Sequence, residues 1–413
     1  MQREITEAVQ NYFVRLLRDY VHQRPSAEPE EEMNWKLLVQ YTKEQDLSGI
    51  IYCQSKDLKS ANTFALHILK KGFFSDIYRA ANNEYNLSKV QKEFDREKVP
   101  YMLFKGSVLR KYYPIPDIRT MGDVDILIHH ANRKETDMVM KSLGYQRMID
   151  NHAVWTYFKP LQMFELHDIM FYEELSNNVD YGDYFSSVWE TADKVCSRST
   201  ESYCYIPDIN RHFLYTMAHT AKHVINNGMG FRAFLDMVFF CRNAEAIEGK
   251  APNWEWITEE LKKLQLYEFT CICFSLCEYW FDVSMPFRKD KLDPSFADGI
   301  TRKMFRDGIF GLRNDENAAS RSAKEIKRAK TPYYVTALKL TVKRLFPPYE
   351  DMQLIPWYAW VDGKPWLTPA AWVYRWFYCL THKRKTARNL LFEPYQKKDQ
   401  IEEREDYLGK WGL

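Results

Sequence analysis

Apolar residues recur along the chain with two different spacings, and these spacings predict where helices and strands lie. Over residues 1–90 and again over 206–413, many apolar positions are three or four residues apart, as on one face of an α-helix. Over residues 91–205, several short segments alternate apolar and polar positions, as in half-buried strands. The pattern predicts an α+β protein in three parts: a helical lead-in over 1–90, a core with a mixed β-sheet over 91–205, and a helical C-terminal region over 206–413.

Individual helices follow from the same spacing. The helices expected outside the core cover 5–20, 34–43, 58–79, 82–97 and 231–242, with two more between 254 and 281. Within the core, a helix over 133–143 is expected to end at Gly144, because glycine readily takes the left-handed conformation that follows helix C-termini. The highly charged tail, 396–413, is expected to fray.

Two aspartates give the core its clearest chemical signal. In the predicted strand 122–128, alternation sends Asp123 and Asp125 to one face, and Val124 and Ile126 to the apolar one. Two carboxylates about 7 Å apart at Cα raise each other's pKa, and a shared Mg²⁺ ion removes that cost. The alternative is a solvated strand end without a metal.

The residues before this strand predict a phosphate site. Val99–Phe104 has the composition of a buried strand, and Gly106 lets the backbone turn and approach a ligand closely. Ser107 is expected to cap a short helix, whose free N–H groups and dipole favour an anion. Lys105 and Arg119 add positive charge to this turn.

A predicted hairpin brings a third acid. Residues 155–158 and 163–169 both alternate like strands and are joined by a short connection. Glu165 and His167 then share one face, so that Glu165 can complete a metal site or act as a general base. Asp168 is a rival acid, but it lies on the opposite face. An ordinary exposed hairpin is the alternative.

This order of elements resembles the nucleotidyltransferase fold of the DNA polymerase β superfamily. More narrowly, the sequence resembles a group of uncharacterised bacterial nucleotidyltransferase family proteins. The resemblance rests on Leu103–Ser107, Arg119–Asp125, Glu165–His167, His219 with His223 and Asp236, and Phe346–Glu350. Fifteen residues separate Ser107 from Asp123, more than in many minimal members of the superfamily, and the narrower group accommodates such a loop.

The resemblance implies a metal-dependent enzyme that transfers NMP from an NTP to an acceptor hydroxyl and releases pyrophosphate. The catalytic and metal-binding acids would be Asp123, Asp125 and Glu165, with Mg²⁺ or Mn²⁺ as the cofactor. The nucleotide would be held by Lys105, Gly106, Ser107 and Arg119. The residues expected to support these groups or to face the substrate are His167, His219, His223 and Asp236. The alternatives are a non-catalytic nucleotide-binding or interaction module on the same scaffold, and an RNA-modifying enzyme.

Three histidines lie on one face of a predicted helix that Asp208 caps. His212, His219 and His223 are seven and four residues apart, which places them on the same side of the helix. Such histidines can hold a metal, but the glutamate of an H-E-x-x-H motif is absent. Helix packing, with imidazoles bonded to carbonyl oxygens or to Asp236, is the simpler alternative.

Composition narrows the classes of protein. With 46% hydrophobic and 28% charged residues, the chain can bury a sizeable core, and its net charge of +2 requires neither nucleic acid nor membrane as partner. The sequence contains neither a signal peptide nor a run of eighteen apolar residues. Eight cysteines without a C-x-x-C pair predict reduced thiols and a cytoplasmic protein.

The sequence leaves the acceptor open, because a small molecule, a sugar, a protein and RNA all fit these residues. A basic cluster from Arg321 to Arg344 predicts either a solvated helical face or an RNA-binding surface. An aromatic tract over 357–377 predicts either helix packing or a face that touches a membrane.

Overall fold

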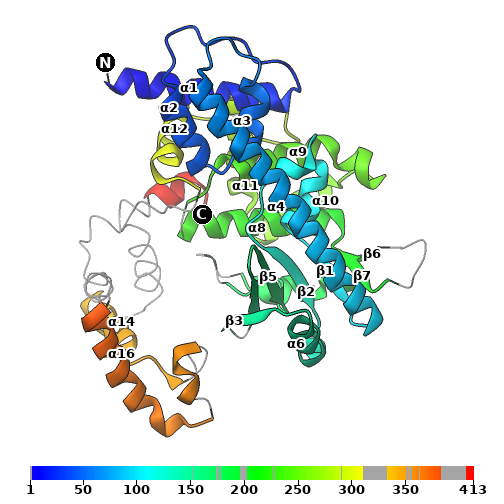
Figure 1. Ribbon diagram of the computed structural model, residues 1–413, viewed down its shortest axis with the longest axis vertical. Helices are drawn as coiled ribbons and strands as arrows, with labels where there is room; N and C mark the ends of the chain where they lie inside the picture. The colour runs from blue at the N-terminus through cyan, green and yellow to red at the C-terminus, as the bar shows by residue number, and fades with distance from the viewer. Residues whose placement is uncertain are drawn as a thin grey trace.

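The computed structural model describes residues 2–413 except for a set of short segments and two longer ones. The excepted residues are 152, 174, 176, 178, 196–201, 227, 290, 310–332, 350, 351, 353–355, 362 and 383–405. Figure 1 shows a helical body, a β-sheet along one side of it, and a separate pair of helices. The predicted α+β class is confirmed. The basic residues from Arg321 to Lys330 and Glu350 lie outside the described residues.

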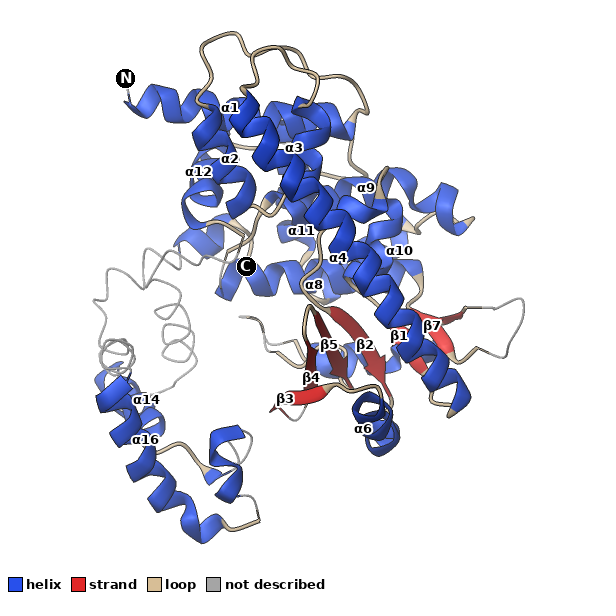
Figure 2. Cartoon of the chain, viewed as in Figure 1, coloured by secondary structure: helices blue, strands red, loops and turns tan. Residues whose placement is uncertain are grey.

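A seven-stranded mixed sheet forms the core and has the order β3-β4-β5-β2-β1-β7-β6. Its strands are β1 Tyr101–Leu103, β2 Val124–Ile128, β3 Gln146–Asn151, β4 Val154–Lys159, β5 Gln162–His167, β6 Asp193–Lys194 and β7 Cys204–Ile206. β2 runs parallel to β5 and β1 runs parallel to β7, whereas the remaining neighbours are antiparallel. Figure 2 shows the strands gathered on one side of the helical body.

The predicted hairpin is confirmed as β4 and β5, joined through Pro160 and Leu161. Leu161 makes this tight connection with a positive φ of 66°. β5 ends at His167, two residues earlier than its alternation indicated. The parallel register of β2 and β5 places Asp125 directly beside Glu165. The register therefore brings together two acids that are forty residues apart in the sequence.

The N-terminal part consists of four helices, α1 Gln2–Val21, α2 Trp35–Glu44, α3 Ser48–Ser55 and α4 Thr63–Arg96. The helices predicted over 58–79 and 82–97 are one continuous helix, so that prediction was wrong. Neither glycine nor proline interrupts 80–83, and the polar side chains there have partners: Asn82 Nδ2 donates to the carbonyl oxygen of Leu161 at 3.0 Å. Helix α4 thus crosses the boundary predicted at residue 90 and contacts the sheet (Figure 1).

Short elements connect the strands of the core. They are α5 Gly106–Leu109, α6 Arg133–Ser142 and α7 Tyr181–Ser186. Helix α6 matches its predicted span, and Gly144 behind it has the expected positive φ of 83°. Val139 of α6 and Phe94 of α4 pack with Val124 and Ile126 of β2 in one apolar cluster. The apolar face of β2 is sealed by helices, as its alternation predicted.

The C-terminal part packs five helices against the N-terminal ones. They are α8 Ile209–Asn226, α9 Phe231–Glu248, α10 Trp254–Lys263, α11 Tyr267–Phe281 and α12 Pro294–Asp307. Asp208 caps α8 as predicted, accepting from the backbone N–H of Asn210 at 2.9 Å. Phe13 of α1 lies beside Phe231 and Phe305 within a single large apolar core.

The end of the chain is partly ordered against this body, contrary to the predicted fraying. Residues 406–410 are helical, and Trp411 is fully buried against Phe269 and Phe296. Burial of one large indole outweighs the charge of the residues around it. The part of the tail before residue 406 lies outside the described residues.

Two further helices, α14 Tyr333–Leu345 and α16 Thr368–His382, form the separate pair in Figure 1. Between them lie the 3-10 turns Pro356–Val361 and Pro365–Leu367. Part of the aromatic tract packs, since Trp372 and Trp376 both contact Phe346. Trp366 and Phe377 remain exposed. Whether this face touches a membrane stays a prediction.

Candidate functional site

The first feature of the site is a buried carboxylate with two basic partners. Asp125 is 5% exposed on β2, and its Oδ1 accepts from Lys105 Nζ at 2.6 Å and lies 2.9 Å from His167 Nε2. Burial by itself would raise the pKa of Asp125, but the lysine and the imidazole outweigh it and lower the pKa to about 2. Asp125 is therefore an anion throughout the physiological pH range.

Asp123 and Glu165 complete the acidic group. Asp123 precedes β2, and burial together with the neighbouring charges of Asp125 and Glu165 raises its pKa to about 7. Glu165 on β5 lies beside Asp125, and its Oε2 is 3.7 Å from His167 Nε2. Alternation along β5 does place Glu165 and His167 on the same face. The negative charges of two carboxylates help to raise the pKa of the third, so this site favours an added positive charge.

The turn after β1 has a different cap from the predicted one. Helix α5 begins at Gly106, with Lys105 at the cap position, so Ser107 is inside the helix and its predicted role as cap was wrong. Ser107 Oγ is instead buried without a hydrogen-bond partner. The backbone N–H of Lys105 donates to His212 Nε2 at 3.1 Å, which fixes the turn from behind.

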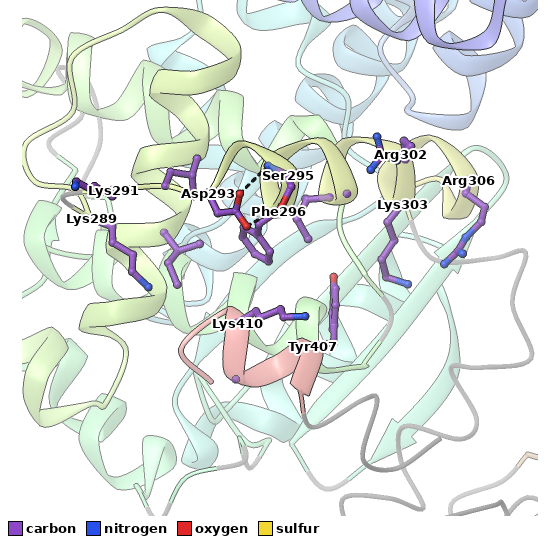
Figure 3. Close-up of a pocket in the computed structure, with 15 residues that line it drawn as sticks. Lys289, Lys291, Asp293, Ser295, Phe296, Arg302, Lys303, Arg306, Tyr407 and Lys410 are labelled. Atoms are coloured by element: carbon purple, nitrogen blue, oxygen red, sulfur yellow. Dashed lines mark hydrogen bonds between the residues drawn. The ribbon is translucent and has the colours of Figure 1, made fainter. Parts of the chain in front are cut away.

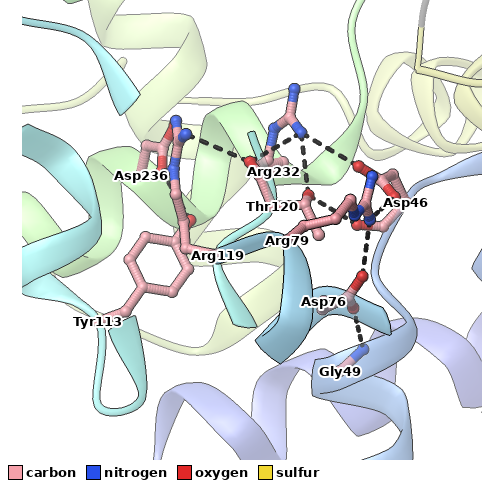
Figure 4. Close-up of polar contacts among 9 residues, drawn as sticks. All are labelled: Asp46, Gly49, Asp76, Arg79, Tyr113, Arg119, Thr120, Arg232 and Asp236. Carbon is pink, nitrogen blue, oxygen red and sulfur yellow. Dashed lines mark hydrogen bonds and ion pairs between the residues drawn. The ribbon is translucent and has the colours of Figure 1, made fainter. Parts of the chain in front are cut away.

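Gly106 leaves room that any side chain would fill. A Cβ atom at this position would lie 2.6 Å from Arg119 Nη1 and 2.6 Å from Met121 Sδ. Arg119 has little freedom to move, because its Nε and Nη2 donate to the two carboxylate oxygens of Asp236 at 3.0 and 2.7 Å (Figure 4). Tyr113 donates to the same carboxylate at 2.7 Å. Among the described residues, the hydrogen bonds of the Asp236 carboxylate thus come from Arg119 and Tyr113 and not from a histidine.

A second arginine, Arg232 at the start of α9, was not predicted. Its Nη1 donates to the carbonyl oxygen of Thr120 at 3.1 Å and to Thr120 Oγ1 at 3.0 Å, and lies 3.5 Å from Asp46 Oδ2 (Figure 4). Asp46 also pairs with Arg79 of α4, which ties the N-terminal helices to this loop. The sequence signal that could have found Arg232 is the Gly228–Gly230 loop, which leads into α9 immediately before that residue.

These groups surround one cavity of about 410 Å³. Of the predicted residues, those that line it are Lys105, Gly106, Arg119, Asp123, Asp125, Glu165, His219, His223 and Asp236. Arg232 and Lys222 line it as well, and Lys222 pairs with Glu173. Ser107 is not part of the described lining, and His167 reaches the site only through Asp125 and Glu165.

The histidines of α8 support the cavity as neutral side chains. His219 stacks on Tyr215 and meets His223 edge to face, with ring centroids 4.5 Å apart. Burial lowers the pKa of His212 to about 3 and that of His223 to about 4, and it holds the pKa of His219 well below its usual value. His212 Nε2 accepts a hydrogen bond from the backbone N–H of Lys105, so this imidazole holds the turn in place.

The residues present fit a divalent cation. Asp125, Glu165 and His167 each bring one ligand atom within 4.8 Å of the others, and Asp123 adds a carboxylate to the same cavity. Carboxylate oxygens are the ligands that hard cations such as Mg²⁺ and Mn²⁺ prefer. Asp168, the rival acid, is not part of the described lining of this cavity and pairs instead with Arg133 Nε and His130 Nδ1, both at 2.6 Å.

The structure thus has an α+β fold that directs three acids and several basic side chains into one cavity. The comparison with protein families is more specific: the model of the family described as "Uncharacterised nucleotidyltransferase" matches residues 31–282. The chain belongs to this family, whose name supports nucleotidyl transfer in general. No curated protein and no solved structure matches the chain.

Two further findings bear on the sequence predictions. Within the described part of the chain, no helix is long and apolar enough to cross a membrane. The seven described cysteines are all free thiols, as predicted from their spacing. The eighth cysteine, Cys196, lies outside the described residues.

Proposed function

We propose that the protein transfers a nucleoside monophosphate from an NTP to an acceptor hydroxyl and releases pyrophosphate. The observation that carries this proposal is the placement of three acids, Asp123, Asp125 and Glu165, in one cavity with the Gly106 turn. Mg²⁺ or Mn²⁺, held by these carboxylates, would supply Lewis-acid stabilisation of the phosphate oxygens. The α-phosphorus of the NTP gains a bond to the acceptor oxygen and loses its bond to pyrophosphate.

The turn and the basic side chains would hold the triphosphate. Gly106 offers a backbone that a phosphate can approach without meeting a Cβ, and Lys105 and Arg119 lie on either side of it. Arg232 adds a guanidinium whose Nη2 has no hydrogen-bond partner among the described residues. Ser107 would contribute through its buried hydroxyl only if a ligand or water reached it.

Lys105 would have two partners during the reaction. Its ammonium now neutralises Asp125 at 2.6 Å, and the pKa of Lys105 is well above its usual value, so the side chain stays charged. When a cation neutralises Asp125 instead, Lys105 becomes available to a phosphate. Glu165 would then complete the acidic site or accept the proton of the incoming hydroxyl, since its side chain is 28% exposed to the cavity side.

Three substitutions test these roles. We expect Asp123→Asn, Asp125→Asn and Glu165→Gln each to lower the rate of α-labelled NMP transfer by about a hundredfold or more, because each removes a carboxylate that would hold the divalent cation on the reacting phosphate. The matched control is Asp168→Asn, an acid close to Glu165 in sequence that is used by Arg133 and His130. Full transfer by a folded Asp123→Asn protein would contradict the proposal.

A nucleotide-binding module without turnover is the second candidate. The observation that favours it is the Lys105–Asp125 pair, because an acid already neutralised by lysine has less need of a metal. Calorimetry that detects NTP binding, together with no labelled product from any of the four NTPs, would favour the module. Product formation that depends on the added cation would exclude it.

A further inference from the structure

A second, larger cavity of about 730 Å³ lies on the opposite side of α12 from the N-terminal helices. It is formed by the loop before α12, by α12 itself and by the helix 406–410 (Figure 3). Among the described residues, six basic side chains and one acidic side chain line it: Lys289, Lys291, Arg302, Lys303, Arg306 and Lys410 against Asp293. Such a ratio contrasts with the near-neutral charge of the whole chain.

Half of these cations have no acidic partner. Within the described chain, Lys289, Lys291 and Arg302 make no ion pair, whereas Lys303 and Arg306 share Asp307 at 2.7 and 2.8 Å. Lys410 is paired with Asp406 at 2.6 Å. The single acid of the lining, Asp293, is engaged as the cap of α12, where it accepts from the N–H and hydroxyl of Ser295. The cavity therefore retains a net positive charge that an anion would neutralise.

The cavity also has an aromatic and apolar wall. Phe296, Ile300 and Leu292 line it from the α12 side, and the half-buried ring of Tyr407 faces them from 406–410. In Figure 3 the side chains of Lys303 and Lys410 both extend toward Tyr407. A single phosphate ion needs about two or three hydrogen-bond donors, and it does not need an aromatic and apolar wall. Cations spread along a helix beside aromatic rings match a chain of phosphates that carries bases, because bases stack on aromatic side chains.

We call the 730 Å³ cavity with the six cations the basic cavity, and the 410 Å³ cavity with the three acids the catalytic cavity. The two cavities are neighbours. A small cavity between them is lined by Ile300, Lys303 and Tyr407, which belong to the basic cavity, and by Gly228 and Met229, which belong to the catalytic cavity. A ligand held along α12 would thus have one end near the loop that precedes Arg232.

From these contacts we infer that the basic cavity binds a single-stranded nucleic acid and delivers its end, as the acceptor, to the catalytic cavity. The inference deepens the proposed function, on which it rests for the transfer step. In that step the terminal hydroxyl oxygen bonds to the α-phosphorus of the NTP, its proton passes to a base, and pyrophosphate leaves. Binding in the basic cavity needs neither the NTP nor the metal.

Binding of fluorescein-labelled dodecanucleotides, followed by anisotropy, tests this site. The double variant Lys291→Glu/Arg302→Glu changes two exposed cations without an ion pair and should weaken binding of the RNA or DNA oligonucleotide about tenfold or more. It should also flatten the fall in affinity between about 50 and about 200 mM salt, because fewer counterions are released. The matched control is Lys70→Glu/Lys71→Glu, which makes the same charge change on exposed residues of α4 and should leave affinity within twofold.

Inorganic polyphosphate distinguishes a nucleic acid from a bare polyanion. Tyr407→Ala should lower affinity for the oligonucleotide and leave affinity for polyphosphate unchanged, because only bases stack on the ring. The RNA and DNA arms identify which sugar the site accepts. The inference would be overturned if the wild type bound no oligonucleotide or if both double variants lost affinity equally. It would also be overturned if the wild type bound polyphosphate as tightly as it binds the oligonucleotide.

The Asp123→Asn/Asp125→Asn protein separates this inference from the proposed function. If it binds the oligonucleotide normally while the wild type transfers no nucleotide, only the proposed function fails. If the wild type transfers nucleotide to some other acceptor and binds no oligonucleotide, only the basic-cavity inference fails. Thermal unfolding of each variant shows whether it is folded, so a loss of binding is assigned to the site and not to misfolding.

Discussion

Lys105 links the two halves of the site through its backbone and its side chain. Its φ of 53° is unusual for a residue with a Cβ, and such conformations cost about 1–3 kcal/mol each. The conformation aims the N–H at His212 and the ammonium at Asp125. This cost is borne at the turn that we propose for phosphate binding, where backbone strain is commonly found.

At Gly106, a single methyl group is expected to impair nucleotide binding. In Gly106→Ala the new Cβ would lie 2.6 Å from Arg119 Nη1, and the Asp236 carboxylate holds that guanidinium in place. We expect NTP affinity to fall about tenfold, or ~1.4 kcal/mol, when measured by calorimetry. The matched control is Gly122→Ala, because a Cβ there meets no atom within 4 Å. Equal affinities for both variants would contradict a phosphate site at this turn.

The residue types in the sequence revealed the three acids of the site, but they did not reveal how the side chains around those acids pair. Alternation alone placed Asp125 and Glu165 on faces that the parallel register then joined. The pairing of Arg119 with Asp236 depends on how α9 packs beside the loop after α5, and spacing in the sequence contains no such information. The wrong cap at Ser107 has a local cause, since a backbone with positive φ at Lys105 starts the helix two residues earlier than a serine cap would.

At the scale of elements, α8 is expected to make the fold sensitive to acid. His212 is buried and His219 and His223 are half-buried at the cavity wall, and desolvation lowers the pKa to about 3 for His212, to about 4 for His223 and well below its usual 6.5 for His219. Below pH 6.5 the unfolded chain binds protons that the folded chain does not. The contribution of these histidines to the free energy of unfolding is therefore fully present above pH 6.5. It falls as the pH decreases, by about 1.4 kcal/mol per pH unit for each histidine.

Urea unfolding between pH 7 and pH 5 measures this dependence. We expect His223→Gln to reduce the slope of unfolding free energy against pH, because one fewer proton distinguishes the two states. His67 is exposed on α4, so His67→Gln serves as the control and should leave the slope unchanged. A wild-type stability that stays constant over this pH range would contradict neutral, buried imidazoles.

Element boundaries were predicted well where a glycine or a cap marks them and poorly where side chains from elsewhere decide. Gly144 ends α6, and Asp208 begins α8, as their local chemistry dictates. The polar residues around Asn82 suggested a break, but Asn82 bonds the β4–β5 turn and the helix continues. A distant hairpin therefore determined the length of α4, and the sequence of the helix alone did not contain this partner.

At the scale of the molecule, the last residues of the chain stabilise the central body. Trp411 is fully buried against Phe269 and Phe296, and it packs beside Tyr407 of the basic cavity. We expect Trp411→Ala to lower the free energy of unfolding by about 3–5 kcal/mol, because it leaves a large cavity in an apolar cluster. Trp366→Ala is the control, since that indole is 72% exposed and its loss should change stability by at most about 0.5 kcal/mol.

The cavity of the three acids is lined by the sheet region and the C-terminal helices, and the N-terminal part supports it from behind. Asp46 and Arg79 of the N-terminal helices hold the loop beside Arg232, the sheet contributes the acids, and α8 and α9 contribute the opposite wall. The sequence predicted the strands and acids because they obey local periodicity. The resemblance indicated His219, His223 and Asp236 of the opposite wall, but the sequence did not predict Arg232, because that side chain reaches the cavity only through packing between helices.

The most direct test of nucleotidyl transfer uses an NTP labelled at both the α- and the γ-phosphate. Each of the four NTPs is incubated with the protein, Mg²⁺ and the single-stranded acceptor, and products are separated by size. Nucleotidyl transfer predicts the α-label in the acceptor and the γ-label in pyrophosphate, with both signals absent from the Asp123→Asn/Asp125→Asn protein. A γ-label found in orthophosphate or in the acceptor would show cleavage at another phosphate and would contradict the account.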